Sequence, residues 1–178
     1  MGFSMATSTL VGQNIGANNI ARAERVARLA ALITFTVLSA VGLLCFLFAS
    51  QIVTLFVPED ADVIREGAVF IRTVAWSFGF IGLQFALMGV LRASGNTFEA
   101  MLISLVSQWV LQFPLAYILS EHTSLHAHGL WWAFPASNVA TALIAGIWFA
   151  RGDWKKGRLV AEDEIEALKQ DVADNVQI

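Results

Sequence analysis

Four long apolar stretches dominate the chain, and they run over roughly 29–57, 67–91, 100–119 and 129–150. Each reaches the roughly 20 residues that a helix needs to cross a hydrocarbon core about 30 Å thick. Short charged breaks separate the stretches. The pattern predicts an all-α fold, a polytopic bundle of membrane-spanning helices. Its function is therefore to be sought in what moves through or across a lipid bilayer.

The composition supports this class. Hydrophobic residues make up 57% of the chain and charged residues 14%, against about 45–50% and 25% in soluble domains. The single cysteine, Cys45, lies inside the first stretch, so it has no intramolecular disulfide partner and is expected to pack. The sequence contains no P-loop, nucleophile elbow or zinc-protease motif. We therefore expect neither enzyme activity nor a catalytic residue, cofactor or nucleic-acid partner.

The charges of the breaks set the orientation, because Lys and Arg in short loops mark the cytoplasmic side. The first, third and fifth breaks are basic, and they carry Arg22, Arg25, Arg28, Arg92, Arg151, Lys155, Lys156 and Arg158. The second is acidic and the fourth acidic and His-rich, and they carry Glu59, Asp60, Asp62, Glu66, Glu121, His122, His126 and His128. This predicts an inner-membrane protein with a cytoplasmic carboxyl terminus. Tryptophans 131, 132, 148 and 154 flank the last stretch as interfacial belts do.

The two ends of the chain differ from the middle. Residues 1–16 are moderately apolar but too short to span, so we expect the end of a transmembrane helix that begins in a longer protein. An interfacial amino-terminal segment is the alternative. Residues 17–150 would then hold the four-helix part. Residues 151–178 would form a cytoplasmic tail, in which Ala161, Ile165, Leu168 and Val172 recur at the spacing of an amphipathic helix.

Small and polar residues occupy opposite faces of the second stretch. One face collects small residues that let helices approach closely, namely Ala75, Gly79, Gly82, Ala86 and Gly89. The other mixes hydroxyl, amide, aromatic and thioether groups, namely Thr73, Ser77, Phe80, Gln84 and Met88. We interpret this second face as a wall of a cavity for varied organic molecules. The alternative is that Gln84 joins two helices by a hydrogen bond.

Polar residues also occur in the third and fourth stretches. Ser104, Gln108 and Gln112 share a face of the third, and Pro114 follows. A proline there favours a kink, and bent helices recur in transporters. The amides could line the cavity or form an interhelical ladder, and both interpretations stay open. In the fourth stretch, Asn138 is the polar residue expected to reach the cavity or a partner helix.

A histidine cluster in the fourth break has residue types that bind metals. Glu121, His122, His126 and His128 give the spacing H-x-x-x-H-x-H. Two histidines four residues apart can share a metal on a helix. The break is short and offers no further ligand, however, so we expect a solvated, titrating loop and no metal site.

Two short patterns occur at the ends of apolar stretches. The first is the VGQ-x-x-GA stretch, with Gly12, Gln13 and Gly16. The second is the G-x-LR-x-x-G-x-T stretch, with Gly89, Arg92, Gly95 and Thr97. Both resemble signatures of the multidrug and toxic compound extrusion (MATE) family. In the family both patterns end helices at the cytoplasmic side, and here both fall in breaks that the charge pattern places there.

The resemblance implies a twelve-helix transporter with two six-helix lobes that face a central cavity, of which this chain would be most of the second lobe. The missing first lobe and the lipid bilayer would be its partners. Family members exchange protons or sodium for small organic, often cationic, compounds. The implied function is efflux by antiport and alternating access, with Gln84, Gln108, Gln112 and Asn138 in the cavity wall.

The chain also departs from the family pattern. Ala93 stands where the family often has glycine, and no carboxylate lies between Arg72 and Arg92. The second departure argues against a sodium site in this lobe and leaves the coupling ion open. The alternatives are a lipid or lipid-linked sugar flippase of the same superfamily, which is disfavoured because Arg72 alone could meet a phosphate, and a non-transport membrane assembly subunit.

Overall fold

The computed structural model describes residues 2–123 and 127–156, and these residues form helices joined by short turns. The elements are α1 (Gly2–Gly16), α2 (Ile20–Leu47), α3 (Ala49–Phe56), α4 (Ala61–Ala75), α5 (Phe78–Ala93), α6 (Thr97–Leu105), the π-helix η1 (Val106–Gln112), α7 (Phe113–Glu121), α8 (Ala127–Arg151) and the short 3₁₀-helix η2 (Asp153–Lys156). The all-α prediction is confirmed. The amphipathic helix predicted near 161–172 lies outside the described residues.

The lengths and hydropathies of the helices fit a membrane protein. Three helices are long and apolar enough to cross a bilayer, over Ile20–Leu47, Thr97–Glu121 and His128–Arg151. A fourth crossing is made if α4 and α5, which meet at an angle of 46°, count as one broken span. The prediction of one continuous second span over 67–91 is therefore wrong. The first span also begins earlier than expected, because the side chain of Asn19 caps α2 by accepting the N–H of Arg22 at 3.2 Å.

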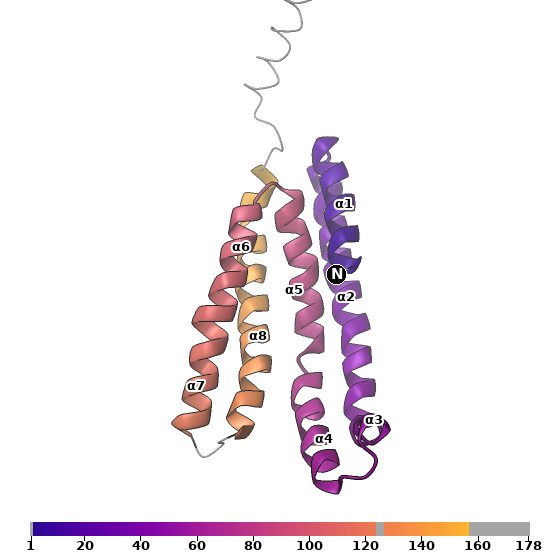
Figure 1. Ribbon diagram of the computed structural model, residues 1–178. Coiled ribbons are helices and arrows are strands. Elements are labelled where there is room, and N and C mark those ends of the chain that lie inside the picture. The colour runs from indigo at the N-terminus through magenta and orange to yellow at the C-terminus, as the bar shows by residue number, and fades with distance from the viewer. Residues whose placement is uncertain (1, 124–126, 157–178) are drawn as a thin grey trace, which may run out of the picture.

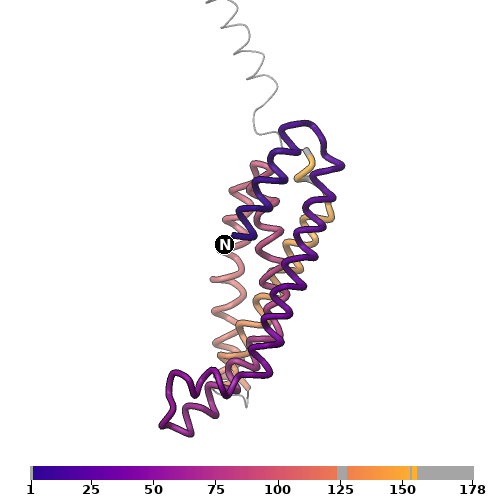
Figure 2. Tube along the Cα trace, turned by 90° about the vertical axis from the view of Figure 1, so that its right-hand side faces the viewer, coloured from indigo at the N-terminus to yellow at the C-terminus, as the bar shows by residue number. Residues whose placement is uncertain are grey.

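The connections alternate between the two ends of the bundle. Figure 1 shows the α1–α2 junction, the α5–α6 turn and η2 at the upper end, and α3, α4 and the end of α7 at the lower end. The three basic breaks thus share one end and the acidic breaks share the other, as the charge alternation requires. Figure 2 shows the same arrangement from the side: α1 rises to the upper end, and α2 returns from there to the lower end. Which end faces the cytoplasm stays a prediction.

Helix α5 is the centre of the bundle, because it packs on α1 and α2 on one side and on α6 and α8 on the other. On the side of α5 that faces α1 and α2, glycines allow the helix backbones to approach closely. A Cβ at Gly82 would lie 2.4 Å from the carbonyl oxygen of Thr34, and a Cβ at Gly89 would lie 2.6 Å from that of Ser4. The small-residue face predicted from the sequence is therefore a close helix–helix contact. The opposite side is apolar and buried, with Leu87, Met88 and Leu91 packed on Ala100 and Ala145.

Two turns at the upper end share one geometry. Asn18, after α1, and Gly95, after α5, have left-handed backbones with φ of 54° and 82°. In each turn this residue and the next donate N–H groups to carbonyls of the preceding helix, at 2.8–3.3 Å. This is the Schellman arrangement, which favours glycine and tolerates asparagine. It gives a backbone reason for Gly95 in the second sequence pattern.

After α8 the chain turns toward the bundle at its upper end, where Trp154 and Lys155 contact residues of the other helices. We call these two residues the clasp. Trp154 is 0% exposed and stacks on Phe149 with ring centroids 5.2 Å apart. Lys155 Nζ lies 2.7 Å from a carboxylate oxygen of Glu24, which also pairs with Arg28. The prediction that Trp154 belongs to an interfacial belt is wrong. The left-handed Gly152 (φ 77°) turns the chain inward and buries the indole among residues of α1, α2 and α5.

The glycine contact of α5 generates a first prediction. Gly82→Ala should lower the melting temperature of the purified protein, because the added methyl group meets the Thr34 backbone; overpacking of this kind costs about 1–3 kcal/mol. Gly146→Ala is the matched control, since its Cβ would meet no atom within 4 Å. The control should keep or raise the melting temperature. Equal melting temperatures for the two variants would contradict the close contact.

The clasp generates a second prediction. Trp154→Ala should destabilise the protein by on the order of 3 kcal/mol, because it empties a buried site between four helices. Trp109→Ala removes the same side chain from a position that is 64% exposed and should have a small effect. Thermal unfolding in detergent, followed by tryptophan fluorescence, compares the two. The clasp is refuted if Trp109→Ala is the more damaging change.

Candidate functional site

The break between α4 and α5 is the most irregular point of the broken span. Ser77 lies at the break and its hydroxyl donates to the carbonyl of Val74 at 2.8 Å, while its N–H donates to the same oxygen at 3.0 Å. Hydroxyl groups that bond back to the preceding turn bend helices. Trp76, next to Ser77 at the break, is 47% exposed. A hollow of about 210 Å³ adjoins it, lined by Ser39, Gly42, Leu43, Phe46, Ala75 and Trp76.

An aromatic row crosses the bundle at this break. It consists of Phe35 on α2, Phe80 on α5, Trp76 at the break and Trp132 on α8. Neighbouring ring centroids lie 5.9, 6.3 and 6.1 Å apart. The first two contacts are edge-to-face, an arrangement that leaves ring faces free for other groups. The sequence pattern indicated Phe80 but not the other three, because the link from α2 to α8 runs through Trp76 at the bend.

The five residues predicted to line a cavity from the second span lie in different surroundings. Thr73 and Ser77 are buried, and their hydroxyls donate to carbonyls of α4, those of Val69 and Val74. Met88 is 4% exposed and belongs to the packed core against α6 and α8. Phe80 and Gln84 are half-buried, one turn apart on α5. Of the five, Phe80 belongs to the aromatic row, and the role of all five in a cavity stays a prediction.

The third span contains a π-helix where a kink was predicted. The segment Val106–Gln112 has wide turns, and the N–H of Phe113 donates to the carbonyl of Gln108, five residues back. Pro114 follows in the first turn of α7, where its missing N–H costs little. Gln108 is exposed and Gln112 is half-buried. Single π-helical segments occur frequently at functional sites.

A buried hydroxyl cluster holds η1 against α8. The hydroxyls of Ser107 and Thr141 are hydrogen-bonded to each other, and the Ser137 hydroxyl donates to the carbonyl of Ser107 at 3.3 Å. The interhelical hydrogen bonds of the third span thus involve Ser107 rather than Gln108. Sequence reasoning missed Ser107 because one residue shifts the helical face by 100°. Asn138, next to Ser137 on α8, is half-buried.

The residues of the two sequence patterns meet at the upper end of the bundle. A Cβ at Gly12 would touch Ala93 at 3.9 Å, and Arg92 Nη1 donates to the Ser4 hydroxyl at 3.4 Å. Gly89 is pressed against the backbone of α1. Gln13 and Gly16 are exposed on α1, and Thr97 begins α6. The described part of the structure gives no packing reason for Gly16.

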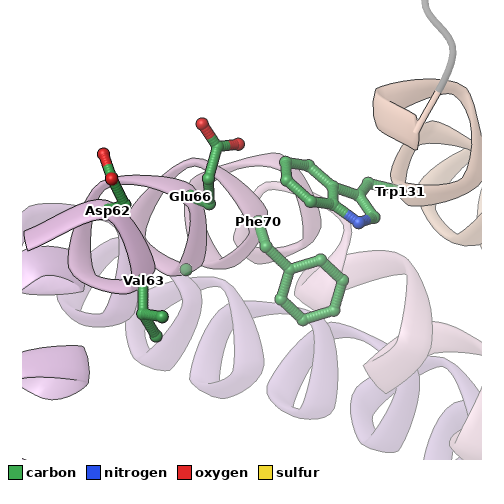
Figure 3. Close-up of a pocket in the computed structure, with 6 residues that line it drawn as sticks. Asp62, Val63, Glu66, Phe70 and Trp131 are labelled. Atoms are coloured by element: carbon green, nitrogen blue, oxygen red, sulfur yellow. The ribbon is translucent and has the colours of Figure 1, made fainter. Parts of the chain in front are cut away.

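A groove of about 400 Å³ lies at the other end, between α4 and α8 (Figure 3). Asp62, Val63, Glu66, Gly67, Phe70 and Trp131 line it. Phe70 and Trp131 are in edge-to-face contact, with centroids 5.8 Å apart. His128 Nε2 lies 4.0 Å from a Glu66 oxygen. Among the described residues no three His, Cys, Asp or Glu side chains gather as metal ligands, and His126 lies outside them.

Comparison with known proteins gives consistent results. The MatE family model matches residues 1–118. The chain is 25% identical over 167 residues to a probable multidrug resistance protein NorM of Thermotoga maritima, covering 94% of this chain and 36% of the relative. It is 28% identical over 155 residues to a probable multidrug resistance protein YoeA of Bacillus subtilis, covering 87% and 33%. The chain therefore spans about a third of the length of these curated relatives.

Two solved structures share the fold. One is an inward-facing multidrug resistance MATE family transporter of the MOP superfamily, with a TM-score of 0.81 and 21% identity over 88% of this chain and 36% of that chain. The other is the MATE transporter ClbM in complex with Rb⁺, with a TM-score of 0.74 and 20% identity over 88% and 34%. At this identity the likeness concerns the fold.

Proposed function

This chain belongs to the MatE family, whose model matches its residues 1–118, and we propose that it acts as part of an efflux transporter for small organic compounds. It is an integral membrane protein by its family and its apolar helices. The transporter would lie in the inner membrane and work by alternating access. The relatives with multidrug resistance names support export as the activity.

The aromatic row at the break of the second span is the observation that carries the proposal. Broken helices near the bilayer midplane form substrate sites in many transporters. Here the break exposes Trp76 beside Phe80, and Gln84 lies one turn further along α5. Aromatic faces attract organic cations, at about 0.5–2 kcal/mol for each contact. We infer that these three residues form one wall of the cavity and that cationic amphiphiles are the preferred substrates.

We propose that export is coupled to protons or sodium through a residue outside this chain. Coupling ordinarily uses a carboxylate within the membrane. The chain has none between Arg72 and Arg92. Arg72 itself donates to the Ser50 hydroxyl of α3 at 3.5 Å. The first lobe of the complete transporter would then hold the coupling group and close the cavity.

The proposed orientation predicts which end of the bundle reacts from outside. In a Cys45→Ala background, single cysteines at Glu59 and His122 should react with an impermeant maleimide added to intact cells. Cysteines at Ala17 and Glu99 should react only after permeabilisation. The basic breaks motivate this assignment, because Lys and Arg are retained inside. The reverse labelling pattern would invert the orientation.

The proposed cavity wall predicts a change of selectivity. In the complete transporter that contains this chain, Gln84→Ala and Trp76→Leu should change the relative export of several chemically distinct cations at least threefold, with nearly normal protein abundance. Met88→Ala is the control: it should lower abundance, because it cuts into the core. Drug accumulation assays with quantitative blots separate the two effects. An unchanged export profile in both cavity variants would make these residues structural.

A further inference from the structure

Helix α3 leaves the direction of the span that precedes it. The chain turns at Phe48, between the end of α2 at Leu47 and the start of α3 at Ala49. Figure 1 views α3 nearly end-on while α2 runs down the picture, and Figure 2 shows this segment projecting sideways from the lower end. The apolar stretch predicted over 29–57 is therefore not one span, because its last part lies across the axis of the bundle.

The length of α2 places this turn at the edge of the hydrocarbon core. Arg22, Arg25 and Arg28 lie in the first turns of α2, at the end that we assign to the cytoplasm. From the next residue, Leu29, to Phe48 the chain rises about 30 Å at 1.5 Å per residue, which is the thickness of the core. Helix α3 thus begins where the apolar interior of the bilayer ends and the headgroup region starts.

One side of α3 is held by α4. A Cβ at Gly67 of α4 would lie 3.0 Å from a methyl carbon of Val53, so the two helices are in close contact there. Arg72 of α4 donates to the hydroxyl of Ser50 at 3.5 Å. These contacts fix α3 against the outer half of the broken span.

The remaining surface of α3 divides into a polar and an apolar side. Thr54 is exposed on the polar side, and its hydroxyl donates to the carbonyl of Ser50 at 2.9 Å. Phe56 lies on the opposite side, because two residues turn a helix by about 200°. Leu55 and Phe56 are 80% and 79% exposed, the highest values among the large apolar side chains of the described residues. The helix is therefore amphipathic, with an uncovered apolar side.

This apolar side continues the lipid-facing surface of α2. Leu47 and Phe48 at the turn are exposed, and only 11% of the most apolar part of α2 is buried within the described structure. No basic residue lies within α3, and the acidic Glu59 and Asp60 follow it, so anionic headgroups would not attract this segment. The chemistry of the apolar side therefore fits acyl chains and does not use lipid charge.

We propose that α3 is an interfacial helix, which lies in the headgroup region of the outer leaflet with Leu55 and Phe56 among the upper acyl chains and Thr54 toward water. Amphipathic helices of this kind bury their apolar side about 5–10 Å into the boundary between headgroups and acyl chains. Through Val53 and Ser50, α3 would hold α4 at a fixed depth. This lipid contact does not depend on which compounds are exported.

Nitroxide spin labels on single cysteines measure this depth in vesicles of phosphatidylcholine that contain the purified chain. In a Cys45→Ala background, Phe56→Cys and Thr54→Cys place the label on opposite sides of α3. Oxygen concentrates among acyl chains and a neutral nickel chelate stays in water, so the ratio of their collision rates with the label reports depth. The ratio of oxygen to nickel collisions should be about threefold higher at Phe56 than at Thr54.

Variants of the neighbouring residues test what holds the helix. With the label at Phe56, Leu55→Ser should lower the collision ratio about twofold, because it removes apolar contact with the acyl chains. Thr54→Ser is the matched control: it changes an exposed side chain on the polar side and should leave the ratio unchanged. Addition of phosphatidylglycerol to the vesicles should also leave the ratio unchanged, since α3 carries no charge.

Three results would overturn the proposal. An equally low ratio at both labelled positions would place α3 in water. Few collisions with either reagent at Phe56 would mean that protein covers this side, from a second copy of the chain or from another part of the transporter. A high ratio at Phe56 that requires phosphatidylglycerol would make the attachment electrostatic.

Discussion

The contact between the backbones of α5 and its two neighbours, α1 and α2, is the constraint on which the rest of the structure depends. In a membrane, helices gain little from hydrophobic burial, so close van der Waals contact must hold them. Glycine supplies that contact here, because Gly82 faces the Thr34 carbonyl and Gly89 faces the Ser4 carbonyl without a side chain between them. Gly42 of α2 contributes from the other side, against the Ala75 carbonyl. The helix that carries the candidate site is thereby fixed along its whole length.

Because α5 is held in this way, the direction of α4 is set by the bend between the two helices. The hydroxyl and the N–H of Ser77 both donate to the Val74 carbonyl inside the bend, so this oxygen is satisfied although the helical ladder is broken. The change of direction then swings Trp76 toward Trp132 of α8 and turns Phe80 toward Phe35 of α2. The row of four rings therefore depends on the glycine contacts that hold α5 and on the bend between α4 and α5. The row thus links α2, α5 and α8 through four side chains, and Gln84 follows Phe80 one turn further along α5.

Much of the fold follows from one-dimensional patterns. Span number, the alternation of ends and the small-residue face of α5 depend on hydropathy, charge and a 3.6-residue period, and all three can be read along the chain. The break at Ser77 could not be read in this way, because serine is common in unbroken helices and its effect depends on which carbonyl it reaches. The interfacial position predicted for Trp154 is wrong for a related reason. A tryptophan near a span end is usually interfacial, and the turn at Gly152 that buries it depends on tertiary space between α1, α2 and α5.

The two ends of the bundle are held by different interactions, and the difference bears on how a lobe could move. The clasp end combines a fully buried indole with ion pairs from Lys155 and Arg28 to Glu24, and its turns have fixed left-handed residues. The other end joins α4 to α8 through the aromatic pair of Phe70 and Trp131, and it places Gly129 of α8 directly against the backbone of Leu119 in α7. Edge contacts between rings tolerate small rotations, whereas a packed indole and paired charges do not. The aromatic contact between α4 and α8 therefore resists small rotations less than the clasp does. Phe70 and Trp131 also line the groove beside Glu66, whereas the aromatic row lies further along the bundle, at the break before α5.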